Sequence, residues 1–600
     1  MAGVRQALIL VGLALAGCVG QAEDRPLDFY DPSASGKTDA FGRRLAGIPS
    51  DYPAEALDEA LLQGDARARR EAAWTTVGKV LEQVPLLGLV DAPAGSTEPV
   101  LANGEIPKVP RYETWYGIDD VKRIFQHLYE ALDPASRAVR TPFDDAAIAE
   151  AVKWNATSLD RMSSWPLERY LKYVRELGMC PADLSDEACL ERVLENFSGA
   201  VGGNTRILYS PGTVDHVLRN YGRILDCLKQ LDGLAVSAQP TASDNFSFCF
   251  ERELPSNSVL VKAQWLRADF GRKVPAFDTD AAALTRLVGG TAQWSDAGDR
   301  QRDPSPRDIF TIRLRNGDTY RLVGMHIMTK ELRHWQWITL FWSDAADKDF
   351  GADRPERVRQ LLQPVWSHYK MCVVDGFAEG DADAPGRFAD HPDLAEALRA
   401  VDRGAGGPTW CSNPYIEHGR GNGRSNCVGC HQHGGSTVAQ DLDGDGRLDP
   451  LNLEAIITDE LHFPDNGRRR IRELFPADYL YSFNHVDDLA GMIAGEVTFF
   501  DGADRDAVLS RIQRILGMTG VATAGGATFA ERCTPCHGPG GEGSAVAPSL
   551  YERVPMRDDT TLLQVLINGR GQMPKWGGVF SDQELADLFA FLRATFGSHD

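Results

Sequence analysis

The chain has 600 residues, of which 85 are Asp or Glu and 63 are Lys or Arg, so its formal net charge is −22. This excess of negative charge excludes electrostatic binding to nucleic acid or to anionic lipid and favours basic redox proteins as partners. A chain of this length is long enough for about three domains.

The first residues have the pattern of a signal peptide. Residues 1–5 carry a basic side chain, and the apolar run 7–16 that follows is too short to cross a bilayer. The run ends in Leu15-Ala-Gly-Cys18, which resembles the bacterial lipobox; the resemblance implies cleavage after residue 17 and lipidation of Cys18. Because Val19 follows instead of Asp, it implies an outer-membrane lipoprotein that faces the periplasm or the exterior and contacts the membrane through its lipid alone. The alternative is an ordinary secreted protein.

Composition and periodicity divide the rest of the chain. Residues 19–55, rich in Asp, Pro, Ser and Gly, predict a tether, and residues 56–404 predict an α+β domain with an antiparallel sheet. Helical periodicity marks residues 56–84, 118–132, 144–154, 167–177 and 213–231. Strand patterns mark residues 258–268, 310–323 and 334–342. Within 310–323, Asn316-Gly317 predicts the type I′ turn of a hairpin. After residue 404 short helices and glycine-rich loops replace the sheet pattern.

One pentapeptide, Cys-x-x-Cys-His, occurs twice in this last part of the chain. It is the attachment motif of c-type haem, in which the two thiols bind the haem vinyl groups and the histidine becomes the proximal iron ligand. The predicted attachment residues are Cys427, Cys430, Cys533 and Cys536, and the predicted proximal ligands are His431 and His537. We therefore expect two covalent haem c groups, one in a segment spanning 405–515 and one in a domain spanning 520–600. A thioredoxin-like pair or half a zinc site is the alternative.

Six cysteines remain after Cys18 and the four haem cysteines. An even number in an oxidising compartment suggests three disulfides, of which fifteen connectivities exist. Pairing each cysteine with its nearest neighbour gives Cys180–Cys189, Cys227–Cys249 and Cys372–Cys411.

Residues 525–597 resemble class I cytochrome c over nearly the whole length of such a domain. The motifs that carry the resemblance are Thr528-Phe-Ala530 before the haem cysteines, Ala547-Pro-Ser-Leu550, Asn568-Gly-Arg-Gly-Gln-Met573-Pro574, and a terminal helix, 581–592, that opens with a Ser581–Glu584 capping box. The resemblance implies that a carbonyl of the proline segment accepts the Nδ1–H of His537 and that Met573 is the sixth iron ligand. Met556 is a weaker rival. Two axial ligands imply electron transfer at a raised potential.

The first haem motif has no such loop after it. The candidate distal ligands are His418, His462, His485 and Met492. We select His485, which lies just before a helical stretch. A vacant distal position is the alternative, and it would permit peroxide or small-ligand chemistry at the iron.

An acidic loop follows the first haem motif. Asp441, Asp443, Asp445 and Asp449 alternate around Gly446, a pattern that resembles an EF-hand-type calcium loop. It departs from that pattern at position twelve, where Asn452 replaces the usual Glu. The alternative to a Ca²⁺ site is a solvated acidic turn.

Tryptophan and histidine are concentrated in two segments, residues 325–342 and 410–417. Together these segments resemble uncharacterised bacterial proteins in which an α+β domain is joined to a haem segment. In one interpretation the tryptophans form the sheet core and wall off a haem edge. In the other, His326 or His334 is an acid–base group and Trp335 an electron relay.

Together these features predict a multidomain protein, an α+β domain followed by mostly α-helical cytochrome c-like domains. The predicted function is that of a lipid-anchored, extracytoplasmic dihaem c-type cytochrome that transfers electrons. Two alternatives stay open: a dihaem oxidoreductase of the peroxidase type with a vacant first haem, and a binding module wired to haem. Whether the chain is an enzyme is therefore left undecided.

Overall fold

The structure is a computed structural model. It describes the short strand 27–28 and residues 49–85, 108–152, 183–186, 188–189, 205–225, 253–268, 273–297, 299–313, 319–404, 407–417, 422–424, 426–431, 478–480, 482, 489–500, 505–541, 547, 550, 554, 559–569 and 573–597.

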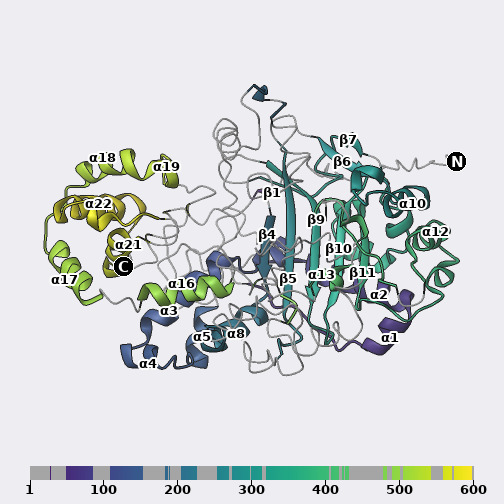
Figure 1. The fold of residues 1–600 in the computed structure, drawn as a ribbon, viewed down its shortest axis with the longest axis horizontal. Helices are drawn as coiled ribbons and strands as arrows, with labels where there is room; N and C mark the ends of the chain where they lie inside the picture. Colours follow the sequence, from purple (N-terminus) through teal and green to yellow (C-terminus); the bar gives the residue numbers. More distant parts are fainter. Residues whose placement is uncertain are drawn as a thin grey trace, which may run out of the picture.

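A seven-stranded sheet forms the centre of the larger body (Figure 1). Its strands are β1 (Leu27–Asp28), β4 (Thr205–Tyr209), β5 (Val259–Arg267), β8 (Thr311–Arg313), β9 (Thr319–Thr329), β10 (Gln336–Trp342) and β11 (Tyr369–Val374). The long strand β9 pairs with β5 along one edge and with β8 and then β10 along the other, and β10 pairs with β11. All these pairs are antiparallel; β1 alone among the described strands of this sheet pairs in parallel, with β8.

The sheet has two faces that the alternation along β10 defines. Trp337, Thr339 and Phe341 point to one side, here called the Trp337 face, and Ile338 and Leu340 point to the other, the Leu340 face. Every residue of β10 is buried, so both faces are covered.

Helices α1 (Glu59–Gly64) and α2 (Ala66–Leu81) open the described body, and α2 covers the Leu340 face. Thr76 on α2 donates to Gln336 at 3.0 Å, and Arg70 forms a buried ion pair with Asp353 at 2.6 Å. Near α2 lie α11 (Glu356–Leu361) and the 3₁₀ turns η5 (Asp349–Gly351) and η6 (Pro364–His368).

Residues 407–417 run over the Trp337 face. Asn413 donates to the carbonyl of Leu340 at 2.9 Å and lies against Gly324, where a Cβ would come within 3.0 Å of the Asn413 amide. The disulfide Cys372–Cys411 fastens this segment to β11. The remaining elements near it are β6 (Val274–Phe277), β7 (Asp299–Arg302), α10 (Ala281–Gly289), η4 (Trp294–Ala297), η7 (Ala384–Phe388), α12 (Pro392–Val401) and η8 (Asn422–Arg424).

A group of helices lies beyond β4, in the lower left of the larger body in Figure 1. They are α3 (Ile118–Ala131), α4 (Pro134–Ala138), α5 (Asp145–Ala151), α8 (Pro211–Arg219) and α16 (Leu489–Phe500), with the small hairpin β2 (Gln83–Pro85) and β3 (Lys108–Pro110) and the turn η2 (Arg111–Thr114) near α2. Gln126 on α3 donates to Glu496 on α16 at 2.8 Å.

The C-terminal helices form a second body with its own hydrophobic core (Figure 1, left). They are α17 (Arg505–Leu516), α18 (Ala522–Arg532), α19 (Thr534–His537), α21 (Asp559–Asn568), η11 (Trp576–Gly578) and α22 (Asp582–Phe596). A hydrogen bond from Thr561 to Glu130 connects the two bodies.

The α+β class with an antiparallel sheet is confirmed, and so are the expected strands β5 and β10 and the hairpin of β8 and β9. The hairpin turn at 314–318 and the expected helix at 167–177 lie outside the described residues. Of the three expected disulfides, Cys372–Cys411 is confirmed. Cys189 is also disulfide-bonded, but its expected partner Cys180 lies outside the described residues, as do Cys227 and Cys249.

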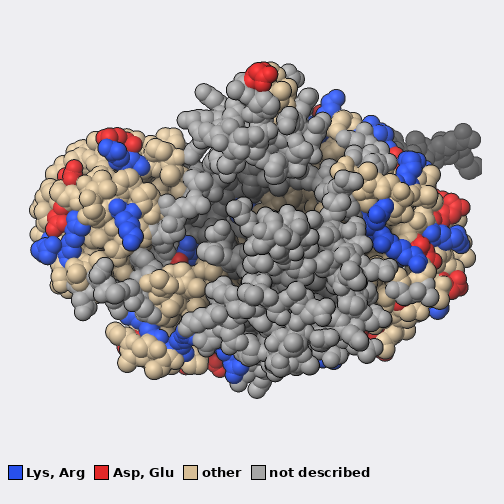
Figure 2. Space-filling model, in the orientation of Figure 1, with Lys and Arg blue, Asp and Glu red and all other residues tan. Residues whose placement is uncertain are grey.

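No helix in the described parts of the chain is both long and apolar enough to span a membrane. On the described surface seen in Figure 2, basic and acidic side chains are interspersed among neutral ones. The strong net negative charge is therefore not gathered into one acidic patch on that part of the surface.

Candidate haem sites

The first haem motif forms a short helix, α13 (Cys427–His431), that an asparagine attaches to the sheet. The Asn426 side chain accepts the N–H of Gly429 at 3.1 Å, the usual role of an N-cap. Its amide donates to the carbonyls of Thr409, Gly376 and Phe377. A Cβ at Gly429 would lie 3.0 Å from the ring of Phe377, so glycine permits this close approach. The helix is therefore fixed at the end of β11.

The imidazole of His431 is held on two sides. Its Nδ1 lies 3.0 Å from the backbone carbonyl of Tyr479, and its ring centroid lies 4.5 Å from that of Trp337 on β10. A carbonyl can only accept, so Nδ1 carries the proton and Nε2 keeps its lone pair. Burial lowers the pKa of His431 to about 4, so the ring is neutral at neutral pH. A neutral imidazole with Nδ1–H on a carbonyl is the usual state of an iron-ligating histidine.

Tyr479 is positioned by the hairpin turn between β9 and β10. Asp478 accepts from Lys330 at 2.9 Å and from the indole of Trp335 at 3.1 Å. Asp478 and Tyr479 both have positive φ, 46° and 71°, so the backbone turns sharply here and presents the Tyr479 carbonyl to His431. No sequence pattern marks this carbonyl, because any residue type can supply it.

A row of polar side chains lies near His431 on the Trp337 face. Lys262, His326 and Thr339 are neighbours across β5, β9 and β10. His326 Nε2 lies 3.0 Å from Glu417 Oε1. Burial alone would raise the pKa of Glu417, but His326, the Asn413 N–H and Lys262 lower it below its usual value. Glu417 is thus a carboxylate.

His334 and Trp335, the other groups considered for acid–base or relay roles, have structural contacts. His334 Nδ1 lies 2.7 Å from Glu59 of α1, and Trp335 binds Asp478. Trp337, not Trp335, contacts His431. These positions favour the interpretation in which the tryptophans form the sheet core and wall off a haem edge.

The second haem motif lies in the C-terminal body. Helix α18 ends at Arg532. Cys533 is the N-cap of the next short helix, α19, which has proline in its first turn and ends at His537. Pro535 explains why the cysteines do not continue α18, since proline cannot donate a helical hydrogen bond. Cys533 is buried, His537 half-buried and Cys536 exposed.

Helices α18 and α22 cross in close contact behind this motif. A Cβ at Gly525 would overlap the carbonyl of Asp587 and come within 2.8 Å of Leu588 Cα. The rings of Phe529 and Phe591 are in contact, tilted by 39° with 5.1 Å between their centroids. The expected capping box of α22 is present: the Ser581 hydroxyl accepts the N–H of Glu584, and the Glu584 carboxylate accepts the N–H of Ser581.

Met573 packs, half-buried, against the same hydrophobic core as Cys533. It follows Gly569, whose φ of +68° allows the turn after α21. Cys427, Cys533 and Cys536 are reduced thiols. The residues present at both motifs therefore fit a covalently bound haem.

Several predicted site residues lie outside the described residues. They are Cys18, the acidic loop Asp441, Asp443, Asp445 and Asp449, the distal candidates His418, His462 and His485, the proline segment residue Pro548, and Met556. Cys430 is described in its backbone only. Met492, the remaining distal candidate, is buried in α16 as part of the larger core.

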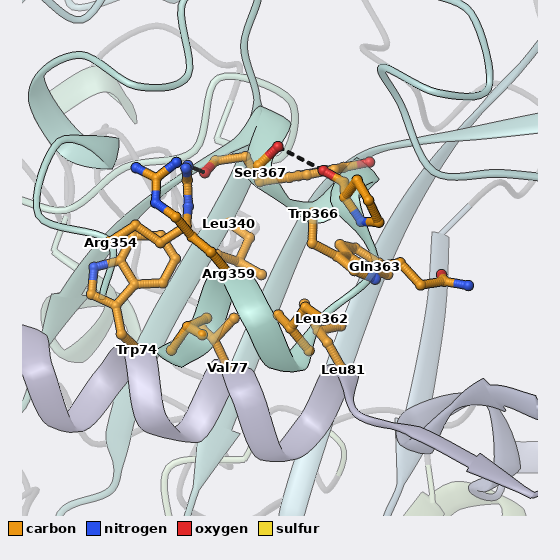
Figure 3. A pocket seen from close by; sticks show the side chains of 13 residues that line it. Trp74, Val77, Leu81, Leu340, Arg354, Arg359, Leu362, Gln363, Trp366 and Ser367 are labelled. Atoms are coloured by element: carbon orange, nitrogen blue, oxygen red, sulfur yellow. Dashed lines mark hydrogen bonds between the residues drawn. The ribbon is translucent and has the colours of Figure 1, made fainter. Parts of the chain in front are cut away.

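A pocket elsewhere in the larger body is too small for a haem (Figure 3). It lies on the Leu340 face between α2 and the segment from α11 to η6, and its volume is about 20 Å³. That is room for little more than a water molecule. Trp74, Leu340, Arg354 and Trp366 are among its lining residues.

A comparison with known protein families finds a match over the segment that contains the second motif. Residues 520–592 match the family model described as cytochrome c oxidase, cbb3-type, subunit III. They form a cytochrome c-like domain. Such a domain implies covalently bound haem c, electron transfer with redox partners and a location outside the cytoplasm.

A curated relative is similar over a longer stretch. The Cbb3-type cytochrome c oxidase subunit CcoP of Cereibacter sphaeroides is 28% identical over 187 residues, which cover 29% of this chain and 59% of that protein. The chain thus spans about three fifths of the relative's length. No solved structure matches the chain.

Proposed function

We propose that this chain is a lipid-anchored, extracytoplasmic dihaem c-type cytochrome that transfers electrons between redox proteins. The second haem is supported by the presence of a Cys-x-x-Cys-His motif within the cytochrome c-like domain at 520–592. The first haem is supported by the hydrogen bond between His431 Nδ1 and the Tyr479 carbonyl, which makes Nε2 the nitrogen that would bind iron.

The chain's own residues would hold each haem at a thioether pair and a histidine. Cys427, Cys430 and His431 hold the first, and Cys533, Cys536 and His537 hold the second. Haem, when bound, supplies one-electron redox chemistry. The protein's part at the first site is to keep His431 neutral and oriented, and to exclude water with the indole of Trp337.

We further propose Met573 as the sixth ligand of the second haem and His485 as that of the first. Met573 is supported by its position on the core that contains Cys533. We also propose that Cys18 is lipidated and that the redox partners are basic proteins. A Ca²⁺ site is proposed at Asp441, Asp443, Asp445 and Asp449. The proposed domain limits are residues 404 and 520. The described parts of 405–500 share one hydrophobic core with the sheet, so the proposed limit at 404 divides two sequence segments and not two hydrophobic cores.

The decisive experiment counts haems in matched variants. The pyridine haemochrome assay should give two haems per wild-type chain. The variant Cys427→Ala/Cys430→Ala and the variant Cys533→Ala/Cys536→Ala should each retain one. One haem in the wild type would reduce the protein to a monohaem cytochrome.

The polar row near His431 favours one second candidate, a dihaem oxidoreductase that binds a small molecule at a vacant first haem. Low-temperature EPR of the oxidised protein separates the two functions. Two low-spin signals support electron transfer alone, whereas a high-spin signal that disappears in Cys427→Ala/Cys430→Ala supports the oxidoreductase.

A further inference from the structure

A buried carboxyl group lies at the end of β11, beside the first haem motif. Asp375 follows β11 directly and is fully buried, and neither of its carboxyl oxygens has a hydrogen bond to any described residue. An ionised carboxylate is strongly disfavoured in such a place, because it loses its hydration and gains no hydrogen bond in return. Asp375 is therefore a neutral carboxylic acid in this structure.

The backbone on either side of Asp375 supports the first haem motif. The preceding residue pairs with Trp337, whose ring packs on His431 with 4.5 Å between centroids. The carbonyl of the following residue, Gly376, accepts the amide of Asn426 at 3.2 Å, and Asn426 caps α13. Figure 1 shows α13 beside β10 and β11. The acid is thus built into the support on which the proposed haem ligand stands.

Charged groups from α2 and from the turn after β11 surround this acid. One oxygen of Glu379 accepts the N–H of Asp375 at 2.7 Å, and the other lies 3.3 Å from Arg69 on α2. Arg70, the second arginine that α2 brings to β11, is already paired with Asp353 at 2.6 Å. Each of the two arginines therefore has another carboxylate as its closest partner.

These surroundings hold the proton on Asp375. Burial and then the charge of Glu379 raise the pKa of Asp375 well above its usual value; Arg69 lowers it and Glu59 on α1 raises it. Glu59 is itself bound to His334, at 2.7 Å. The proton affinity of Asp375 is therefore set by nearby charges, and a new positive charge close by would lower it.

We propose that Asp375 binds a proton when the haem on His431 is reduced and releases it when that haem is oxidised. This inference rests on the proposed haem at His431. In the reduction, one electron passes from a redox partner to ferric iron, and the carboxylate of Asp375 takes one proton from solvent, so the total charge of the site does not change. Unit charges roughly 10 Å apart in a protein interior change a proton affinity about tenfold.

The test measures the midpoint potential of each haem from mildly acidic to alkaline pH in the full-length, haem-loaded protein. The potential of one haem should fall as pH rises through the range in which Asp375 titrates, because a carboxylate stabilises ferric iron. A tenfold difference in proton affinity between the two oxidation states corresponds to a total fall of about 59 mV for a one-electron couple.

Asp375→Asn is the decisive variant, since an amide has the shape of a protonated carboxyl and cannot ionise. The potential of that haem should then stay near its acidic wild-type value over the whole range. Asp393→Asn, at an exposed position on α12, is the control for the loss of one carboxyl and should keep the fall. Glu59→Gln should keep the fall but move it to lower pH, because a charge that disfavours ionisation of Asp375 is removed.

A second measurement detects the proton itself. The reduced protein is oxidised with ferricyanide in weakly buffered solution, and a pH-indicator dye reports the protons released. The wild type and Asp393→Asn should release up to one proton more per chain than Asp375→Asn does.

An equal fall of the potential in the wild type and in Asp375→Asn overturns the inference, and so does equal proton release. The haem count distinguishes this failure from that of the proposed function: if Cys427→Ala/Cys430→Ala keeps every haem of the wild type, the first haem itself is absent. If Asp375→Asn fails to fold, Asp375→Leu takes its place in both measurements, because it leaves no polar atom buried without a partner.

Discussion

The Nδ1 atom of His431 donates to the backbone carbonyl of Tyr479 at 3.0 Å, and Tyr479 itself is held because its neighbour Asp478 binds the β9–β10 turn. His431, the proposed proximal ligand of the first haem, is therefore oriented by residues almost fifty positions away in the sequence. This contact should control the electronic properties of that haem, since a hydrogen bond to Nδ1–H makes the imidazole a stronger donor to iron.

We predict that Asp478→Ala raises the midpoint potential of one haem and leaves the other unchanged. Loss of Asp478 frees the Tyr479 carbonyl from the hairpin turn, weakens its bond to His431, and makes the ligand less basic. The buried Lys330 ammonium also loses its closer carboxylate and keeps the Arg333 carbonyl and the more distant Glu253, so the free energy of unfolding should fall by about 1 to 3 kcal/mol. Redox titration and urea denaturation measure the two effects. An unchanged potential would mean that the carbonyl does not tune the iron.

Removal of the Cys372–Cys411 disulfide should destabilise the larger body. The bond closes a loop with a sequence separation of 39 residues, and in the chain-entropy model such a loop contributes about 4 kcal/mol. We expect Cys372→Ser/Cys411→Ser to lose most of that amount in urea denaturation. The unfolding of the C-terminal body, which has its own core, serves as the internal control and should not shift.

The close crossing of α18 and α22 should not tolerate a side chain at Gly525. A Cβ there overlaps the carbonyl of Asp587, so Gly525→Ala should lower the stability of the C-terminal body by roughly 2 to 3 kcal/mol. Gly495→Ala is the matched control, since a Cβ at this helical position meets nothing within 4 Å. Thermal unfolding followed at the haem absorbance measures both. Equal stability of the two variants would show that α18 can move away from α22 without loss of stability.

Met573→His should abolish the methionine-to-iron charge-transfer band of the oxidised protein and lower the potential of one haem. A nitrogen ligand stabilises ferric iron more than a thioether does. Optical spectroscopy and redox titration of wild type, Met573→His and Met556→Ala give the answer. Loss of the band in Met556→Ala, with retention in Met573→His, would assign the ligand to the other methionine.

Glu113 should make stability depend on pH. Burial raises the pKa of Glu113 to about 8, although Tyr112 and Arg206 oppose this rise. Between the unfolded pKa near 4.5 and the folded pKa near 8, the folded state binds more protons than the unfolded state, so stability falls as pH rises. The full change is roughly 5 kcal/mol at most.

Glu113→Gln should flatten this dependence, and Glu356→Gln, at an exposed position, should not. Urea denaturation of the larger body between acidic and mildly alkaline pH measures the slope in both variants. A slope in Glu113→Gln equal to that of the wild type would assign the pH dependence to other groups.

The sequence predicted the features that local patterns encode. The alternation of 310–323 predicted the hairpin, and the Ser581–Glu584 spacing predicted the capping box, because both depend on residues close together in the chain. The two haem motifs were evident for the same reason. The contacts of His431 with Trp337 and Tyr479 were not predictable, since they depend on the pairing of distant strands and on a backbone carbonyl that any residue could supply.

The two haem motifs belong to hydrophobic cores of very different size, and this difference affects when each haem can be attached during folding. Val428, between the first pair of haem cysteines, is fully buried in the core that the sheet and its helices share, whereas Cys533 belongs to the small C-terminal core. Haem attachment needs an accessible, unfolded Cys-x-x-Cys-His segment. At the second motif, haem attachment must precede the folding of the small helical body alone. At the first, the proposed attachment at Cys427 must precede closure of the entire α+β body, so synthesis of a correctly folded chain becomes limited by the supply of haem.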